Sequence, residues 1–310
     1  MRITMRMMCR LAALLWLAVA PLAHADALPD GRTIKVFGTD IHYYEMGSGP
    51  TVVLVHGLGS SAFGDWHAVM PKLAKDHHVV ALDQLGFGAS SKPMVDYSIQ
   101  LWVDTLGEFL REKQIHDFTL IGESLGGWIS AKYTIQALQG IAADPAFALP
   151  KPSRLVLCDA AGRRSTFAQL FAPRPANVKM PPMLSLAGQK ATIGAVFYRA
   201  QQHASAQDIR DGLAWALGKD DGWTVHSVTT NPALLDEAVD GQLDAIRIPT
   251  LLLWGAHDGL VPVADGRWYA AGIAGSQLKL IADSAHVPMT EQPDAWLAAL
   301  RPFLDHSAAP

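Results

Sequence analysis

Short apolar runs alternate with longer stretches of helical periodicity along most of the chain. Several runs are apolar at every position, as in parallel strands covered by helices on both faces. These runs are Thr51–Gly57, His78–Asp83, Phe118–Glu123, Arg154–Ala160, Thr250–Gly255 and Gln277–Asp283. Two further runs near the start, 33–37 and 41–47, predict a hairpin. The sequence therefore predicts an α/β protein with a mostly parallel, eight-stranded sheet and helices on both faces.

Helical periodicity fills most of the intervals between these runs. It marks Ser98–Lys113, Leu125–Leu138, Val263–Ala271 and Pro293–Leu304. The alternation stops once, between Ala160 and Ile246, where the patterns are helical, as in 191–203 and 206–218.

An interruption of this length is too long for a loop. We therefore predict a helical cap inserted at residues 163–245, with the α/β core formed by residues 26–162 and 246–310. The alternative is an ordinary surface elaboration remote from any site.

The first 25 residues follow a different pattern. Arg2, Arg6 and Arg10 precede the apolar run Leu11–Ala23, and the segment ends in an A-x-A sequence at Ala25. A basic start, a short apolar stretch and such a site are typical of a secretory signal peptide. The run is shorter than the ~20 residues of a membrane-spanning helix. We expect export to the periplasm or medium after cleavage at Ala25, with no stable membrane anchor.

Composition narrows the possible partners. Half of the 310 residues are apolar and 17% are charged, which suits a globular protein with a sizeable core. Loss of three arginines with the signal peptide takes the formal net charge from −4 to −7. A mildly acidic chain without lysine or arginine clusters argues against nucleic acid as a partner. Cys158 then remains as a lone cysteine in an apolar run, and we expect a buried core residue.

The segment Gly122–Gly126 fits G-x-S-x-G and joins a predicted strand to a predicted helix, which is the context that this motif requires. A serine at the apex of such a strained turn has its hydroxyl lifted clear of the sheet. Flanking glycines, which lack Cβ, let strand and helix approach closely. We predict Ser124 as a nucleophile. Glu123 beside it either tunes the site or pairs with a nearby base, and we favour the second, structural role because its side chain should point away from Ser124.

A serine nucleophile needs a general base, and the base needs an acid that orients it. Asp258 and His286 follow the last two predicted strands, in the chain order Ser, Asp, His. The carboxyl ends of strands are where open α/β sheets bind ligands. We predict His286 as the base and Asp258 as the acid, with Asp159 as the alternative acid.

An oxyanion intermediate needs hydrogen-bond donors preset where its charge develops. The backbone N–H of Leu125, directly after the nucleophile, is one candidate, and that of Leu58 in the loop 56–61 is the other. We expect His56, at the start of this loop, to be a structural hydrogen-bonding residue.

Five segments together resemble the α/β-hydrolase fold superfamily over essentially all of the mature chain. They are His56–Ser61, Asp83–Pro93, Gly122–Gly127, Gly255–Pro262 and Ala285–Pro293. The second and third are similar to the branch that contains cap-bearing serine esterases and the carbon–carbon hydrolases of aromatic (meta-cleavage) ring-cleavage products. The resemblance implies an active site roofed by a cap, with no cofactor and no metal.

Some residues of this chain differ from those typical of particular enzyme classes within the superfamily, and these differences favour some activities over others. Ser124 argues against dehalogenase and epoxide hydrolase relatives, which have aspartate at the nucleophile. Carbon–carbon hydrolases commonly carry asparagine where this chain has Glu123, and they hold a dienol carboxylate with an arginine and a tryptophan. Arg163, Arg164 and Trp128 are the candidates for that role here.

We predict a serine hydrolase that cleaves small-molecule carboxylic esters through an acyl-enzyme. Carbon–carbon hydrolysis of vinylogous diketones is the alternative, and a binding protein with a degraded hydrolase site is a further one. Candidate pocket residues are Gly57, Trp128, Phe167 and Phe197.

Cell fractionation tests the predicted export. We expect the protein in the periplasm or medium, with its N-terminus at Asp26 by mass spectrometry, because the first 25 residues have the signal-peptide pattern. Uncleaved, full-length protein in the cytosol would contradict this prediction.

Overall fold

The computed structural model describes residues 28–142, 144–171, 184–200 and 205–305, so the predicted signal peptide, 1–25, lies outside the described residues. Eight strands form one sheet in the order β1-β2-β4-β3-β5-β6-β7-β8. They are β1 (Arg32–Val36), β2 (Thr39–Met46), β3 (Thr51–Val55), β4 (His78–Leu82), β5 (Phe118–Glu123), β6 (Arg154–Cys158), β7 (Thr250–Gly255) and β8 (Gln277–Ile281). The predicted hairpin β1–β2 joins β4 in antiparallel pairing, and the strands from β4 to β8 are parallel. The predicted fold class is confirmed.

The helices alternate with the strands. They are α1 (Ala62–Trp66), α2 (Met70–Leu73), α3 (Ile99–Glu112), α4 (Ser124–Gln139), α5 (Arg164–Phe167), α6 (Leu186–Val196), α7 (Ala206–Gly218), α8 (Gly222–Thr230), α9 (Val263–Gly272), α10 (Pro288–Glu291) and α11 (Pro293–Asp305). Short 3₁₀ helices occupy Pro145–Phe147, Ala168–Phe171, Pro232–Glu237 and Leu243–Ala245. The four predicted helices correspond to α3, α4, α9 and α11, with ends that differ by at most one residue.

The sheet separates two hydrophobic clusters. In β3, Val53 and Val55 face a cluster with residues of α3, α4 and α9, whereas Val52 and Leu54 face one with residues of α1, α2 and α11. Alternate side chains of one strand point to opposite faces, so both faces of a central strand are apolar. Cys158 is buried in the second cluster with a free thiol, as the sequence predicts.

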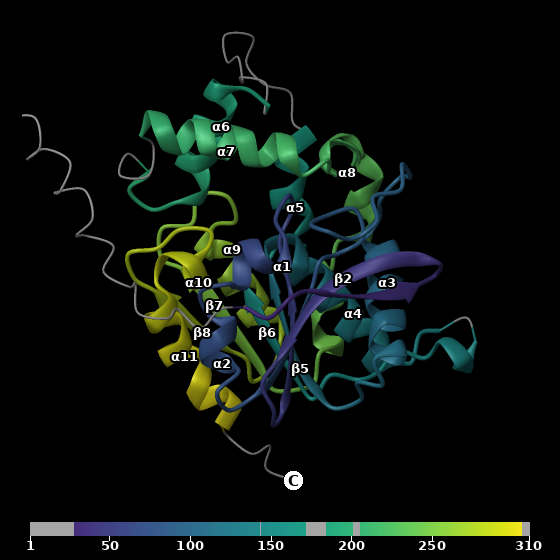
Figure 1. Ribbon diagram of the computed structural model, residues 1–310. Helices are drawn as coiled ribbons and strands as arrows, with labels where there is room; N and C mark the ends of the chain where they lie inside the picture. Colours follow the sequence, from purple (N-terminus) through teal and green to yellow (C-terminus); the bar gives the residue numbers. More distant parts are fainter. Residues whose placement is uncertain (1–27, 143, 172–183, 201–204, 306–310) are drawn as a thin grey trace, which may run out of the picture.

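The described residues between β6 and β7 form helices and no strand. Figure 1 shows α6, α7 and α8 as a layer over one end of the sheet. Helix α7 matches the predicted periodicity at 206–218, but α6 begins before the predicted 191–203 and ends at Val196. Its start is set by Ser185, whose side chain accepts a hydrogen bond from the N–H of Gly188.

Hydrogen bonds tie this helical layer to loops at the carboxyl ends of the strands. The Oγ1 of Thr224 donates to Gly86 O at 3.0 Å, and the Nζ of Lys219 donates to Gly59 O. The N–H of His286 donates to Val196 O at 3.0 Å. The layer therefore contacts the same edge of the sheet as the predicted catalytic residues. Among the described helices, none has the length and apolar character to cross a bilayer.

Close approach between the turn after β5 and strand β3 requires a glycine at position 126. A Cβ built on Gly126 would lie 2.2 Å from the carbonyl oxygen of Val55, which is backbone and cannot swing away. In contrast, a Cβ on Gly194 within α6 would meet nothing within 4 Å.

We predict that Gly126→Ala lowers the free energy of unfolding by about 1–3 kcal/mol, because strand and helix must move apart. Gly194→Ala, the matched control, raises it by about 0.5–1 kcal/mol through helix propensity. Urea unfolding of both variants measures the difference. A Gly126→Ala variant as stable as the parent would contradict the packing described here.

Candidate active site

Ser124 lies on the tight turn between β5 and α4. Its φ of 49° is in the left-handed region, which non-glycine residues seldom adopt. Leu125 follows it within the first turn of α4, where backbone N–H groups have no carbonyl partner inside the helix. The strained turn thus combines a half-buried hydroxyl with the N-terminal turn of a helix, as the sequence predicts for this motif.

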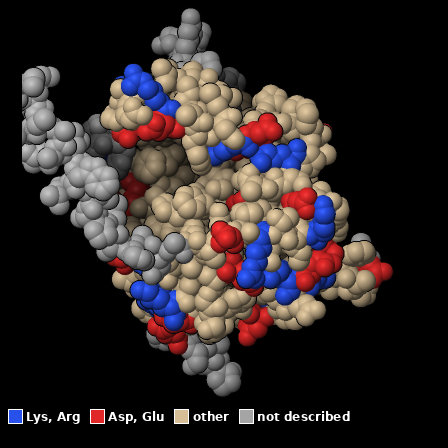
Figure 2. Space-filling view, in the orientation of Figure 1, with Lys and Arg blue, Asp and Glu red and all other residues tan. Residues whose placement is uncertain are grey.

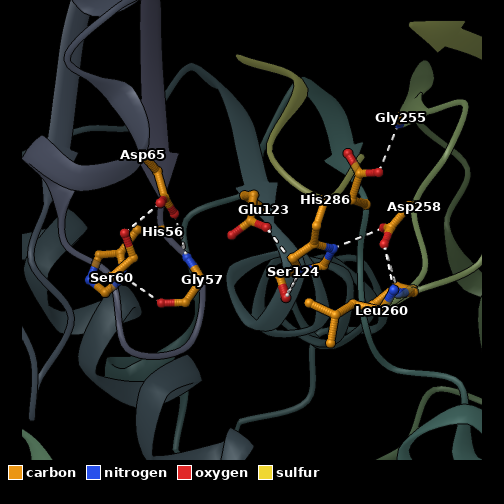
Figure 3. Close-up of polar contacts among 12 residues, drawn as sticks. His56, Gly57, Ser60, Asp65, Glu123, Ser124, Gly255, Asp258, Leu260 and His286 are labelled. Atoms are coloured by element: carbon orange, nitrogen blue, oxygen red, sulfur yellow. Dashed lines mark hydrogen bonds and ion pairs between the residues drawn. The ribbon is translucent and has the colours of Figure 1, made fainter. Parts of the chain in front are cut away.

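Three predicted side chains meet at the carboxyl edge of the sheet (Figure 3). The Nε2 of His286 lies 2.9 Å from the Oγ of Ser124, and its Nδ1 lies 2.8 Å from the Oδ2 of Asp258. His286 and Asp258 are each only 7% exposed. This is the arrangement in which an imidazole takes the proton of a serine while a carboxylate fixes its tautomer.

The carboxylate of Asp258 is held by backbone donors as well. Its Oδ1 accepts hydrogen bonds from the N–H of Leu260 at 2.8 Å and of Val261 at 3.1 Å. Two such bonds stabilise the ionised form of a buried carboxylate. Asp258 therefore has its full set of partners while it faces His286.

Asp159, the alternative acid, is fully buried next to this pair. Its Oδ1 accepts the N–H of Gly255 at 2.8 Å. Burial, and then the negative charge of Asp258, raise the pKa of Asp159 well above its ordinary value, which favours the neutral acid. The structure thus brings both acids to the site, but Asp258 is the one bonded to His286.

Potential ligand atoms of Asp159, Asp258 and His286 all lie within 4.8 Å of one another. The atoms of Asp258 and His286 are already engaged in the hydrogen bonds just described. We therefore assign this cluster to the proton-handling network and not to a metal.

The loop after β3 carries the second predicted oxyanion donor. The N–H of Gly57 donates to Asp65 Oδ2 at 2.8 Å, and the hydroxyl of Ser60 donates to Asp65 Oδ1. Leu58 lies between these two anchors, half-buried against the core. Asp65, in α1, is a functional candidate that sequence reasoning missed, since no motif marks it.

His56 is the structural residue that we expected. Its Nε2 accepts the N–H of Gln84 at 3.0 Å, so its Nδ1 carries the proton and donates to Gly57 O at 2.8 Å. The ring is fully buried, and burial lowers its pKa. His56 is thus a neutral imidazole that shapes the loop.

The expectation for Glu123 is wrong. Its side chain does not point away from the site, because Oε1 lies 3.4 Å from His286 Nε2 (Figure 3). The alternation of side chains holds only while the chain stays extended, and the left-handed turn at Ser124 ends it. Burial, followed by the nearby charge of Asp65, raises the pKa of Glu123 well above its ordinary value.

The candidate pocket residues lie in different environments. Trp128 is fully buried and its Nε1 donates to Glu237 O at 3.1 Å, so its ring packs in the core instead of facing an open pocket. Phe167 packs edge-on against that ring, with centroids 4.8 Å apart. Gly57 lies beside Glu123, and Phe197 follows Val196, the residue bonded to His286.

The two candidate arginines have acidic partners. Arg163 pairs with Asp265 at 3.0 Å, and Arg164 pairs with Asp236 at 3.1 Å. The N–H of Arg164 also donates to Asp240 at 2.8 Å. Neither guanidinium is brought to Ser124 by these contacts.

Figure 2 shows a hollow between the helical layer and the body of the molecule.

Comparison with known proteins identifies related sequences. The family described as alpha/beta hydrolase fold matches residues 50–293. An uncharacterised protein of Mycobacterium tuberculosis is 27% identical, over 84% of this chain and 76% of the relative. A 2-hydroxy-6-oxo-2,4-heptadienoate hydrolase of Pseudomonas putida is 26% identical, over 88% of this chain and 96% of the relative.

A solved structure has a similar fold. A meta-cleavage product hydrolase from Pseudomonas fluorescens, with acetates bound, superposes with a TM-score of 0.73 at 21% identity. The match covers 89% of this chain and 97% of the other.

Substitution of the two acids tests which one orients His286. Asparagine at 258 presents an amide to Nδ1 and favours the wrong tautomer. We therefore predict that Asp258→Asn slows the reaction of Ser124 with a fluorophosphonate on the order of 10⁴-fold. Asp159 is bonded to the N–H of Gly255 and not to His286, so we expect Asp159→Asn to change the rate less than about tenfold. Equal losses in the two variants would contradict the assignment of Asp258.

Proposed function

The chain belongs to the α/β-hydrolase family, and on that premise we propose that it is a serine hydrolase of small-molecule carboxylic esters. The observation that carries the proposal is the 2.9 Å contact between Ser124 Oγ and His286 Nε2. A hydroxyl within hydrogen-bond reach of an oriented imidazole is the geometry that activates a serine nucleophile.

The reaction proceeds in two halves. His286 takes the proton of Ser124 as the hydroxyl attacks the ester carbonyl, and the N–H groups of Leu58 and Leu125 stabilise the oxyanion. His286 then protonates the leaving alcohol, which leaves an acyl group on Ser124. In the second half His286 activates a water that releases the acid. Asp258 holds the imidazole throughout, and the mechanism uses no metal or nucleotide.

We propose residues 163–245 as the cap that roofs this site. The proposal is supported by the hydrogen bonds between the helical layer and the loops of Gly59, Gly86 and His286. The hollow beneath this layer (Figure 2) is where a substrate would enter. A roof of this kind excludes water and strengthens the electrostatic interactions below it.

Carbon–carbon hydrolysis of vinylogous diketones is a second candidate. It is favoured by the similarity to the 2-hydroxy-6-oxo-2,4-heptadienoate hydrolase, which extends over 96% of that protein. The ion pairs of Arg163 and Arg164 with Asp265 and Asp236 speak against it, since both guanidinium groups already have acidic partners within the protein. Because of these ion pairs, we favour ester cleavage over carbon–carbon hydrolysis.

We also propose that the protein acts outside the cytosol. The proposal rests on the N-terminal pattern of arginines and apolar residues, and the mildly acidic mature chain suits a small-molecule substrate more than nucleic acid.

A fluorophosphonate probe followed by a substrate panel tests the function. We predict labelling of the parent protein and none of Ser124→Ala, because only an activated serine reacts. On p-nitrophenyl esters of graded acyl length, kcat/KM exceeds that on a vinylogous diketone. Labelling of Ser124→Ala at an undiminished rate would overturn the assignment of the nucleophile. A preference for the diketone would instead favour the second candidate.

A further inference from the structure

The carboxyl group of Glu123 is packed inside the site and not at its surface. Glu123 is 2% exposed, and a Cβ on Gly57 would lie 2.0 Å from its Oε2, so this oxygen occupies the space that glycine leaves free. The other oxygen, Oε1, is buried and has no hydrogen bond within the described residues. It lies 3.4 Å from His286 Nε2.

The groups that face Glu123 favour a neutral carboxyl. The Oε2 of Glu123 packs against Gly57, whose N–H is bound to Asp65 Oδ2, so the carboxyl groups of Glu123 and Asp65 are neighbours. Asp65 and Asp258 lie close enough to repel a negative charge on Glu123, and His286 is in contact with it. A hydrogen bond between two carboxyl groups requires a proton on one of them. Asp65 already accepts the N–H of Gly57 and the hydroxyl of Ser60, which stabilises it as the anion. The proton therefore resides on Glu123, at the oxygen that faces Asp65.

We propose that Glu123 is a positioning residue that donates its proton to Asp65 and presents its carbonyl oxygen, Oε1, as a second acceptor for the Nε2–H of protonated His286. The inference rests on the proposed serine hydrolase function. It assigns to the site a residue outside the Ser-His-Asp set.

The interaction has opposite signs in the two states of His286. In the resting enzyme Nε2 accepts the proton of Ser124, so its lone pair faces the lone pair of Oε1 and the contact is unfavourable. Once His286 has taken the proton, the Nε2–H still points toward the Ser124 oxygen, and Oε1 at 3.4 Å is the second, weaker acceptor of a bifurcated hydrogen bond from the cation. An interaction that is favourable only after proton transfer stabilises the transition state more than the ground state.

The same carboxyl connects the imidazole to the oxyanion loop. Asp65 holds the N–H of Gly57, one residue before the proposed donor Leu58. A proton shared between Glu123 and Asp65 therefore links the position of His286 to that of this loop. Glutamine has the same shape and can make both contacts, with its NH₂ donating to Asp65 and its oxygen facing His286.

Two substitutions at this position test the proposal, Glu123→Gln and Glu123→Leu. We expect Glu123→Gln to retain kcat on a p-nitrophenyl ester within about threefold. We expect Glu123→Leu to lower kcat about tenfold with KM little changed, which is the effect of losing one hydrogen bond in the transition state. The acidic limb of kcat/KM moves to lower pH in Glu123→Leu, because protonated His286 has lost an acceptor, and stays in place in Glu123→Gln.

Glu108 offers a matched control. It lies on α3 and pairs with Arg111, so Glu108→Gln and Glu108→Leu leave kcat and the pH profile unchanged. Two outcomes would overturn the proposal. If Glu123→Leu has the parent kcat, Oε1 does nothing in the reaction. If Glu123→Gln shifts the acidic limb as far as Glu123→Leu does, Glu123 acts as an anion and not as a neutral acceptor.

Infrared spectroscopy decides the protonation state even if Glu123→Leu fails to fold. The difference between the parent and Glu123→Gln at neutral pH should contain the C=O stretch of a protonated carboxyl group. Carboxylate bands in its place would overturn the proposal. Failure of the proposed function looks different, since it leaves Ser124→Ala active, whereas failure of this inference leaves Ser124 essential and Glu123 dispensable.

Discussion

The contact between Ser124 Oγ and His286 Nε2 joins two segments that are 162 residues apart in the chain. It exists because five parallel strands end at the same edge of the sheet, where β3, β5, β6, β7 and β8 lead into the loops of Gly57, Ser124, Asp159, Asp258 and His286. The left-handed turn at Ser124 raises the hydroxyl toward the imidazole. Strain at that residue is compensated by the buried strands and helices on either side.

Charge is distributed unequally over the carboxyl groups around His286. A buried site of low dielectric does not hold several neighbouring anions, so some of these groups remain protonated. Asp258 has two backbone donors and faces Nδ1, which suits the anion. Burial and nearby charge raise the pKa of Asp159 and of Glu123, which suits the neutral acid. The imidazole therefore lies between one carboxylate and one neutral carboxyl oxygen.

Much of the fold could be predicted from the sequence, because its signals are local. Strand β5 and the turn at Ser124 were predicted from an apolar run followed by G-x-S-x-G, and β7 from a run that is apolar on both faces. The orientation of Glu123 could not be predicted in this way. It depends on the geometry of the turn at Ser124 and on the absence of a side chain at Gly57, which lies in the loop after β3. The same holds for Trp128, whose partner Glu237 is 109 residues away, and for the ion pairs of Arg163 and Arg164.

If Ser124 is the nucleophile, a covalent acyl group forms on it during turnover. The most direct measurement is rapid acid quenching of the enzyme with a p-nitrophenyl ester, followed by peptide mass mapping. We expect the acyl mass on the peptide that contains Ser124, at a level that rises within the first turnover. Steady release of product with no acyl group on that peptide, or with the group on a different residue, would contradict it.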